Sequence, residues 1–161
     1  MFRILGVIYL LLTVVAATRN AVSILPVEYE IVDSPVECFV GFSSSGVQMF
    51  SLCGDARGVT PTPEQIDSLR GGFFTHSHVG DCPTFSFGDV DSGARSGVTQ
   101  VRVVSHLNGK VAVAVLSPPR LIPLHEYQEV FDTTSGPICT RMDQTWRVLA
   151  RRFDFRYDVT S

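Results

Sequence analysis

Two histidines, a serine and an aspartate lie close together in this sequence, and their spacing limits the folds that can use them jointly. His76 and His78 are separated by a single residue, and Ser86 and Asp89 follow shortly afterwards. Two imidazoles and a carboxylate can hold a metal ion and leave a fourth position open for water, which is typical of hydrolytic rather than structural sites. A fold that uses these residues together must bring the two ends of this segment close to one another. The pattern predicts a small zinc hydrolase.

The apolar runs, helix caps and turn residues predict strands and helices packed around one sheet. Thr62, Pro63 and Gln65 are typical of a helix start, with Thr62 as the cap and Gln65 as its capping-box partner. Asn108 and Gly109 suit a type I′ turn between two strands. We expect strands at residues 36–42, 47–53, 72–76, 98–107 and 110–116, and helices at residues 63–69, 86–96, 124–131 and 142–152. This order predicts the α/β class (mixed α+β).

Length and composition indicate a globular protein. The chain has 161 residues, of which 45% are hydrophobic and 18% are charged. This length suits one domain with its own core, which we expect at residues 18–161. The formal net charge of −3 lacks the basic excess that nucleic-acid-binding domains usually carry, so we expect no nucleic-acid partner.

An uncharged apolar run occupies residues 4–17, between Arg3 and Arg19. The run is typical of a secretory signal peptide cleaved after Ala17, or of an N-terminal anchor that contacts a membrane. It is short for a permanent span, which needs about 20 apolar residues. We therefore expect residues 1–17 to be a signal or anchor, and the protein to be secreted, periplasmic or membrane-anchored. The alternative is that the run is a buried strand or helix of the domain, in which case the protein is cytoplasmic.

Four cysteines are present, without the C-x-x-C pair that a cysteine-ligated zinc site usually contains. Export would permit disulfides. Cys38 and Cys53 flank the first predicted hairpin at nearly opposite positions, so this is the first pair to test. We interpret Cys82 and Cys139 as small buried apolar residues.

The predicted elements give each candidate site residue a position. His76 and His78 lie at the end of a strand, where residues two apart point to the same side. Asp89 falls in the first turn of the helix capped by Ser86, where the helix dipole favours a carboxylate. Glu37 lies in an otherwise apolar strand, where a buried charge costs several kcal/mol unless it has a partner. We predict His76, His78 and Asp89 as metal ligands. Glu37 and Ser86 are the predicted catalytic residues.

Taken together, these residues resemble the signature of the JAMM (JAB1/MPN/Mov34) metallopeptidases. The likeness is to the compact JAB-like domains of phage and bacterial proteins, and it covers residues 36–116. It implies a JAB/MPN-like single mixed sheet flanked by helices, with an architecture similar to that of cytidine deaminases. It also implies Zn²⁺-dependent hydrolysis of peptide or isopeptide bonds in a protein or peptide substrate, such as a ubiquitin-like conjugate or a cell-wall peptide. Glu37 would act as general base and acid, and Ser86 would position the water or stabilise the oxyanion.

Other interpretations of the same residues remain. A catalytically inactive MPN-like interaction module would keep the fold without the chemistry. Each residue taken alone also has an ordinary structural interpretation. Ser86 would be a helix cap, Asp89 an acid in the first turn of a helix, and Glu37 an edge-strand residue that faces solvent. A zinc nucleoside deaminase is excluded, because the chain lacks the H-x-E and P-C-x-x-C motifs of that class. Arginines at residues 141–156 alternate with acids, which favours a solvated helix face over a site for an acidic partner.

Overall fold

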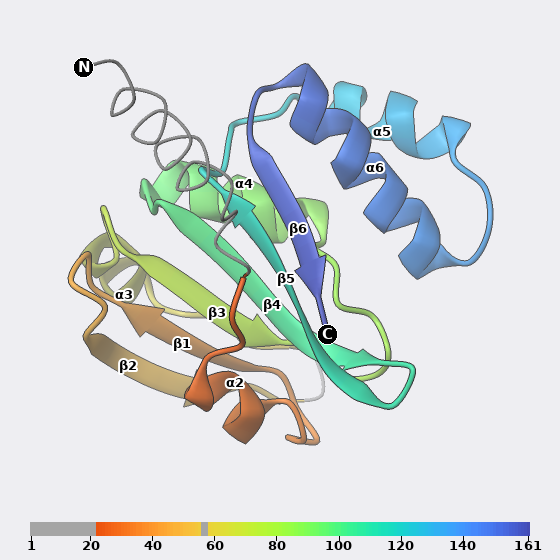
Figure 1. Cartoon of the computed structure of the whole chain (residues 1–161). Coiled ribbons are helices and arrows are strands. Elements are labelled where there is room, and N and C mark those ends of the chain that lie inside the picture. Colours follow the sequence, from red (N-terminus) through yellow and green to blue (C-terminus); the bar gives the residue numbers. More distant parts are fainter. Residues whose placement is uncertain (1–21, 56–57) are drawn as a thin grey trace, which may run out of the picture.

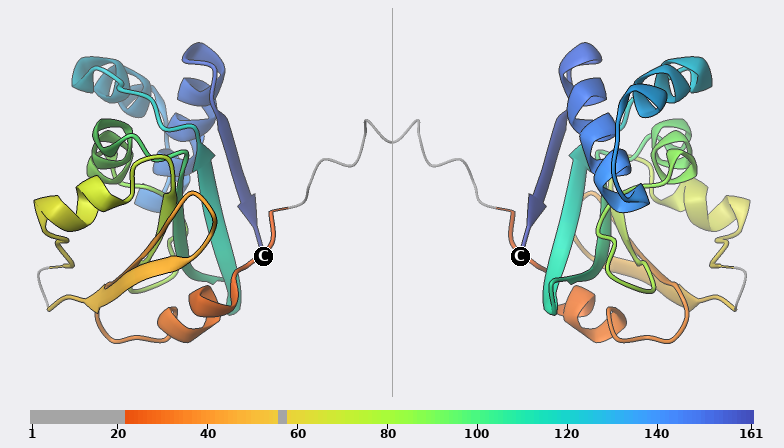
Figure 2. Two further views of the ribbon diagram at one scale, coloured as in Figure 1. Left: turned by 90° about the vertical axis from the view of Figure 1, so that its left-hand side faces the viewer. Right: turned by 90° about the vertical axis from the view of Figure 1, so that its right-hand side faces the viewer.

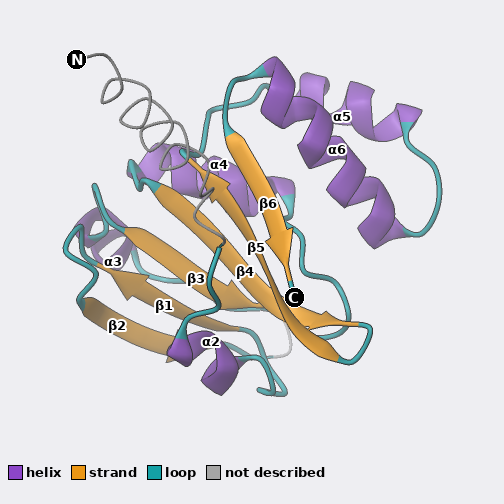
Figure 3. Ribbon diagram, in the orientation of Figure 1, coloured by secondary structure: helices purple, strands orange, loops and turns teal. Residues whose placement is uncertain are grey.

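The computed structural model describes residues 22–55 and 58–161 (Figure 1, Figure 3). Its helices are α2 (Pro26–Ile31), α3 (Pro63–Ser68), α4 (Phe87–Ser96), α5 (Leu124–Thr133) and α6 (Ile138–Arg152). Its strands are β1 (Cys38–Phe42), β2 (Gln48–Cys53), β3 (Phe73–Ser77), β4 (Gln100–Leu107), β5 (Lys110–Ser117) and β6 (Arg156–Thr160). The signal or anchor predicted at residues 1–17 lies outside the described residues.

One six-stranded sheet organises the fold, in the order β2-β1-β3-β4-β5-β6. Neighbouring strands are antiparallel except for β3 and β4, which are parallel. A parallel pair needs a crossover connection, and α4 supplies it between β3 and β4. The predicted mixed α/β class with one sheet is confirmed.

The two faces of the sheet carry separate apolar clusters, because successive residues of a strand point to opposite sides. Val101 and Val103 of β4 pack with Trp146 and Leu149 of α6, in the cluster that also includes α4 and α5. Val104 belongs to the second cluster, with residues of α2. Figure 2 shows α3 to α6 on one side of the sheet and the short α2 on the other. The larger layer of helices therefore covers the face toward which Phe74 and His76 of β3 point.

Local capping and turn signals from the sequence are confirmed. The Thr62 backbone N–H donates to Gln65 Oε1 at 2.8 Å, and the Gln65 N–H donates to Thr62 Oγ1 at 3.3 Å. Asn108 and Gly109 have φ values of 53° and 74°, as the tight turn between β4 and β5 requires. Gly97 ends α4 in the left-handed conformation, with φ 72°.

Three features of the chain differ from the sequence-based expectation. Helix α6 begins at Ile138, directly after Pro137, rather than at residue 142. Neither α2 nor the final strand β6 was predicted. Only Tyr157 of β6 is buried, and the strand is defined by its pairing with β5 rather than by an apolar run.

A buried ion pair fastens the N-terminal segment to the sheet. The Glu28 carboxylate on α2 is fully buried and accepts hydrogen bonds from Arg102 Nε at 2.7 Å and Arg102 Nη2 at 2.9 Å. Thr75 Oγ1 donates to the same carboxylate at 2.8 Å, and Arg102 Nη2 also donates to the Ser23 carbonyl at 2.7 Å. These bonds satisfy the two charges and hold α2 over the face opposite the larger helical layer.

The cysteines form two disulfides. Cys38 and Cys53 are directly paired across β1 and β2, which confirms the first pair that the hairpin suggested. The interpretation of Cys82 and Cys139 as unpaired apolar residues was wrong, because they form the second disulfide. That bridge links the loop between β3 and α4 to the second residue of α6. The sequence near either cysteine does not indicate this pairing, because it depends on how α6 packs against the loop.

Within the described part of the chain, no helix has the length and apolar character needed to cross a membrane.

Candidate metal centre

The end of β3 presents two histidines to the same side of the sheet. His76 lies within β3 and is buried. His78 follows the strand, and its backbone N–H donates to the Val104 carbonyl at 2.9 Å, which continues the pairing with β4. Ser77 lies between them and points the other way, where its Oγ accepts a hydrogen bond from the Cys38 N–H at 2.9 Å. The alternation of a strand therefore brings the two imidazoles together.

The start of α4 supplies a carboxylate opposite these imidazoles. Ser86 caps the helix, and its Oγ accepts from the Asp89 N–H at 3.2 Å, while Asp89 Oδ2 accepts from the Ser86 N–H at 2.7 Å. This capping box fixes the side chain of Asp89 in the first helical turn. Trp146 Nε1 donates to the carbonyl of Phe85 at 2.8 Å, which holds the residue before the cap against α6.

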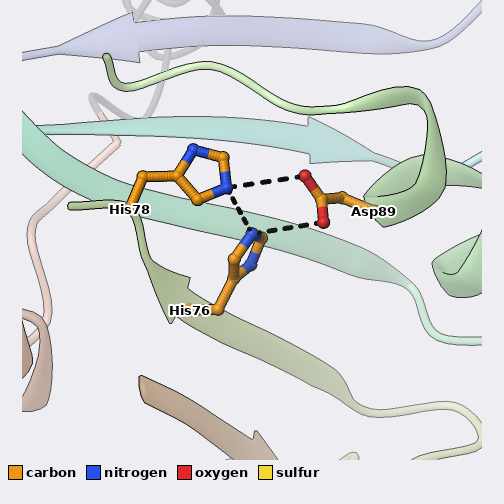
Figure 4. Close-up of side chains that lie close together, drawn as sticks. All are labelled: His76, His78 and Asp89. Carbon is orange, nitrogen blue, oxygen red and sulfur yellow. Dashed lines mark hydrogen bonds and ion pairs between the residues drawn. The ribbon is translucent and has the colours of Figure 1, made fainter. Parts of the chain in front are cut away.

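His76, His78 and Asp89 converge with the geometry of metal ligands (Figure 4). The two Nε2 atoms are 3.0 Å apart. Asp89 Oδ1 lies 3.4 Å from His76 Nε2, and Asp89 Oδ2 lies 3.7 Å from His78 Nε2. Two ligands of a tetrahedral zinc ion with bonds of about 2.0–2.1 Å lie about 3.3 Å apart. The observed separations lie on both sides of this value, so the cluster could hold a metal ion at three corners of a tetrahedron.

The second ring nitrogen of each histidine has a different environment. The His78 imidazole forms a hydrogen bond to the Cys82 backbone, which leaves Nε2 facing Asp89. Such a bond orients a ligating ring and fixes its tautomer. The Nδ1 atom of His76 is buried and has no hydrogen-bond partner among the described residues. The orientation of His76 therefore depends on its packing, with the Phe74 ring 6.0 Å away between centroids.

Charges in the cluster favour a carboxylate facing imidazoles. Burial alone would raise the pKa of Asp89, but His76 and His78 outweigh it and hold that pKa far below its usual range. For His78 burial has the opposite effect and lowers the pKa, because it disfavours the charged imidazolium. Asp89, Glu37 and the Cys82 backbone together outweigh burial and raise the pKa of His78 above its usual value. His78 therefore holds a proton more readily than a free histidine does, with the Asp89 carboxylate ionised beside it.

Glu37 lies beside this cluster without belonging to it. The prediction that it lies within a strand was wrong, because β1 begins one residue later, at Cys38. Its side chain is half-buried, and its backbone carbonyl accepts from the Gly54 N–H at 2.8 Å. Gly58, with φ 118°, approaches so closely that a Cβ there would lie 3.4 Å from Glu37 Oε2. Glu37 lines the same cavity as His76 and Asp89.

That cavity has a volume of about 690 Å³. The candidate site residues that line it are Glu37, His76, Ser86 and Asp89. Beyond them it continues along Phe39 and Phe74 of the sheet and Ile66 of α3. Its size falls in the range of small-molecule sites, which is about 300–1,000 Å³.

Sequence reasoning missed the residues that support the ligands. Cys82 orients His78 through its backbone, and Ser77 ties the end of β3 to the start of β1. The alternation along β3 could have identified Phe74, which points to the same side as His76. No local signal identifies Cys82, because a backbone contact does not depend on residue type.

Comparison with known proteins gives no relative. No family model, curated protein or solved structure matches this chain.

Proposed function

We propose that this protein is a zinc-dependent hydrolase of peptide or isopeptide bonds with a JAB/MPN-like fold. The observation that carries the proposal is the convergence of His76, His78 and Asp89, because His76 and Asp89 line a cavity together with Glu37. Structural metal sites are usually closed by four protein ligands, whereas three ligands beside a cavity leave access for a substrate. The resemblance to JAMM metallopeptidases points to the same residues.

The ligand set suits zinc. Two imidazole nitrogens and one carboxylate oxygen form a donor set found in catalytic zinc sites. When bound there, zinc would supply a Lewis acid that polarises a carbonyl and lowers the pKa of a water to about 7. His76, His78 and Asp89 would hold the ion.

Glu37 and Ser86 have separate roles in this proposal. The Glu37 carboxylate would accept a proton from the attacking water and return it to the leaving amine. The Ser86 hydroxyl would donate a hydrogen bond to the water or to the developing oxyanion, while its oxygen still caps α4. Both groups line the cavity together with His76 and Asp89, which supports these roles.

The first test is the zinc content of the purified full chain, measured beside Asp89→Asn, His78→Ala and Glu37→Gln. We expect about one zinc per chain in the wild type and in Glu37→Gln, and its loss in the two ligand variants. Hydrolysis of a peptide library by the wild type, with Glu37→Gln as the inactive control, then tests the reaction.

Zinc binding without hydrolysis of peptide or isopeptide substrates would favour the inactive interaction module over the enzyme. A folded wild type that neither binds zinc nor gains stability from it would exclude the metal centre itself. Glu37→Gln retaining full activity would remove Glu37 from the mechanism.

A further inference from the structure

The cavity beside the candidate metal centre is lined by polar site residues and also by a group of apolar side chains. The rings of Phe39 and Phe74 stack with centroids 4.7 Å apart and line it from the sheet. Val59 and Ile66 line it from the chain between β2 and β3. Ser92 lines it from α4, on an exposed position of that helix.

We propose that this apolar region is a substrate subsite for a hydrophobic side chain adjacent to the bond that is cleaved. The inference rests on the proposed hydrolase function and adds the substrate class. An aliphatic or aromatic side chain placed there leaves water for an apolar surface, whereas a charged side chain beside the phenylalanine rings loses part of its hydration. The exposed Asp67 and Arg95 line the cavity as well, and Arg95 is paired with Asp91 at 2.8 Å.

Two measurements on the full chain test the subsite, and the first needs no metal. Metal-free protein is titrated with N-acetyl-leucine amide or N-acetyl-serine amide, and the NMR signals of the Val59 and Ile66 methyl groups are followed. The second compares kcat/KM for peptides that differ only by leucine or serine beside the cleaved bond. Ser92→Trp fills the cavity from an exposed position, and Ser92→Ala is the matched control.

We expect the leucine probe alone to shift the methyl signals, and to lose this effect in Ser92→Trp but not in Ser92→Ala. We also expect leucine peptides to be preferred by about tenfold or more, and the preference to fall in Ser92→Trp. Equal shifts from both probes, or no shift from either, would overturn the subsite. The two proposals fail in different ways. If the methyl signals respond to the leucine probe but the protein cleaves no peptide, the hydrolase proposal fails while the apolar binding region remains.

A different set of contacts concerns the two disulfides, which lie next to different parts of the site. Cys82, whose backbone orients His78, is bridged to Cys139, and its N–H donates to Ser105 Oγ at 3.1 Å. Cys38 directly follows Glu37 and is bridged to Cys53. The Cys38 N–H donates a hydrogen bond to Ser77 Oγ. The Gly54 N–H, directly after Cys53, donates to the Glu37 carbonyl.

From these contacts we infer that the disulfides are positioning elements with separate targets. The bridge from Cys82 to Cys139 positions the ligand His78, and the bridge from Cys38 to Cys53 positions the base Glu37. This inference also rests on the proposed function. It predicts that the two bridges control different measurable quantities, namely zinc affinity and the catalytic rate at saturating zinc.

The test replaces each bridge with a pair of serines and measures the zinc Kd, kcat and KM of the folded full chain. We expect Cys82→Ser/Cys139→Ser to weaken zinc binding by about ten- to a hundredfold, the range typical of a lost orienting contact. Cys38→Ser/Cys53→Ser should keep the zinc Kd and KM and lower kcat. Ser105→Ala keeps both bridges and should weaken zinc binding in the same direction as the first pair, so the inference remains testable if that pair does not fold.

Bridges that only stabilise the fold would lower Tm in both variants and leave the zinc Kd and kcat of the folded protein unchanged. That result, or an equal loss of zinc affinity in both pairs, would overturn the inference. A wild type that binds no zinc would instead count against the proposed function.

Discussion

Arg102 and Glu28 form a bidentate ion pair, with Nε to Oε1 at 2.7 Å and Nη2 to Oε2 at 2.9 Å, and both side chains are buried. Removing one partner leaves the other charge buried without compensation, which costs about 3–5 kcal/mol. We expect Arg102→Met or Glu28→Gln to lower the free energy of unfolding by several kcal/mol in urea denaturation. The double variant Glu28→Leu/Arg102→Leu should lose much less. A single variant as stable as the wild type would show that water reaches the pair.

The indole of Trp146 stabilises the segment just before α4 through one hydrogen bond to the Phe85 carbonyl. Trp146→Phe keeps most of the packing but leaves the buried Phe85 carbonyl without its donor, which costs about 1–3 kcal/mol. We expect a lower urea midpoint with zinc stoichiometry unchanged, because the ligands lie outside this contact. Val148→Ala, at a position of α6 that is 40% exposed, is the control and should change the midpoint little.

The two roles of Ser86 can be separated. Ser86→Ala removes the cap of α4 and should cost about 1 kcal/mol of stability, whereas Ser86→Asn keeps a capping oxygen. Neither variant retains the hydroxyl, so we expect both to lose hydrolytic activity while only Ser86→Ala loses stability. Thermal unfolding and kcat measured on the same samples distinguish the two effects. Full activity in Ser86→Asn would limit Ser86 to its capping role.

The effect of zinc on stability should depend on pH. The raised pKa of His78 gives the metal-free folded state a stability contribution that is complete below about pH 6.5 and is lost as the pH rises through the folded-state pKa. The lowered pKa of Asp89 gives a contribution that is present above about pH 4 and is lost as the pH falls toward the folded-state pKa. Zinc must displace the proton on His78. We therefore expect the zinc-induced rise in Tm to be small at pH 5.5 and larger at pH 7.5.

In the pH experiment, Asp89→Asn is the control and should show no zinc-induced rise at either pH. A rise in the wild type that is equal at both values would mean that zinc binds without competing with a proton on His78.

Sequence reasoning succeeded where the interacting residues are close together along the chain. The capping pairs Thr62 with Gln65 and Ser86 with Asp89 each span one helical turn, so their side chains indicate the helix start directly. The convergence of His76, His78 and Asp89 followed from the same local rules, since it needs only a strand end and a capped helix.

The features that were missed depend on contacts between distant segments. The pairing of Cys82 with Cys139 spans 57 residues and requires α6 to pack beside the loop after β3. Strand β6 forms by pairing with β5. The charged residues that alternate along β6 gave no apolar pattern in the sequence. The placement of Glu37 one residue before β1 was equally hidden, since an apolar run does not mark where hydrogen bonding begins.

The parallel step from β3 through α4 has a consequence for how such a site can change. The three candidate ligands all come from this one crossover, whereas Glu37 directly precedes the separate hairpin of β1 and β2. In the proposed function, ion binding and proton transfer thus depend on independent parts of the chain. Under the proposed function, a single substitution at Glu37 would remove proton transfer and leave the candidate ion-binding residues and the fold intact.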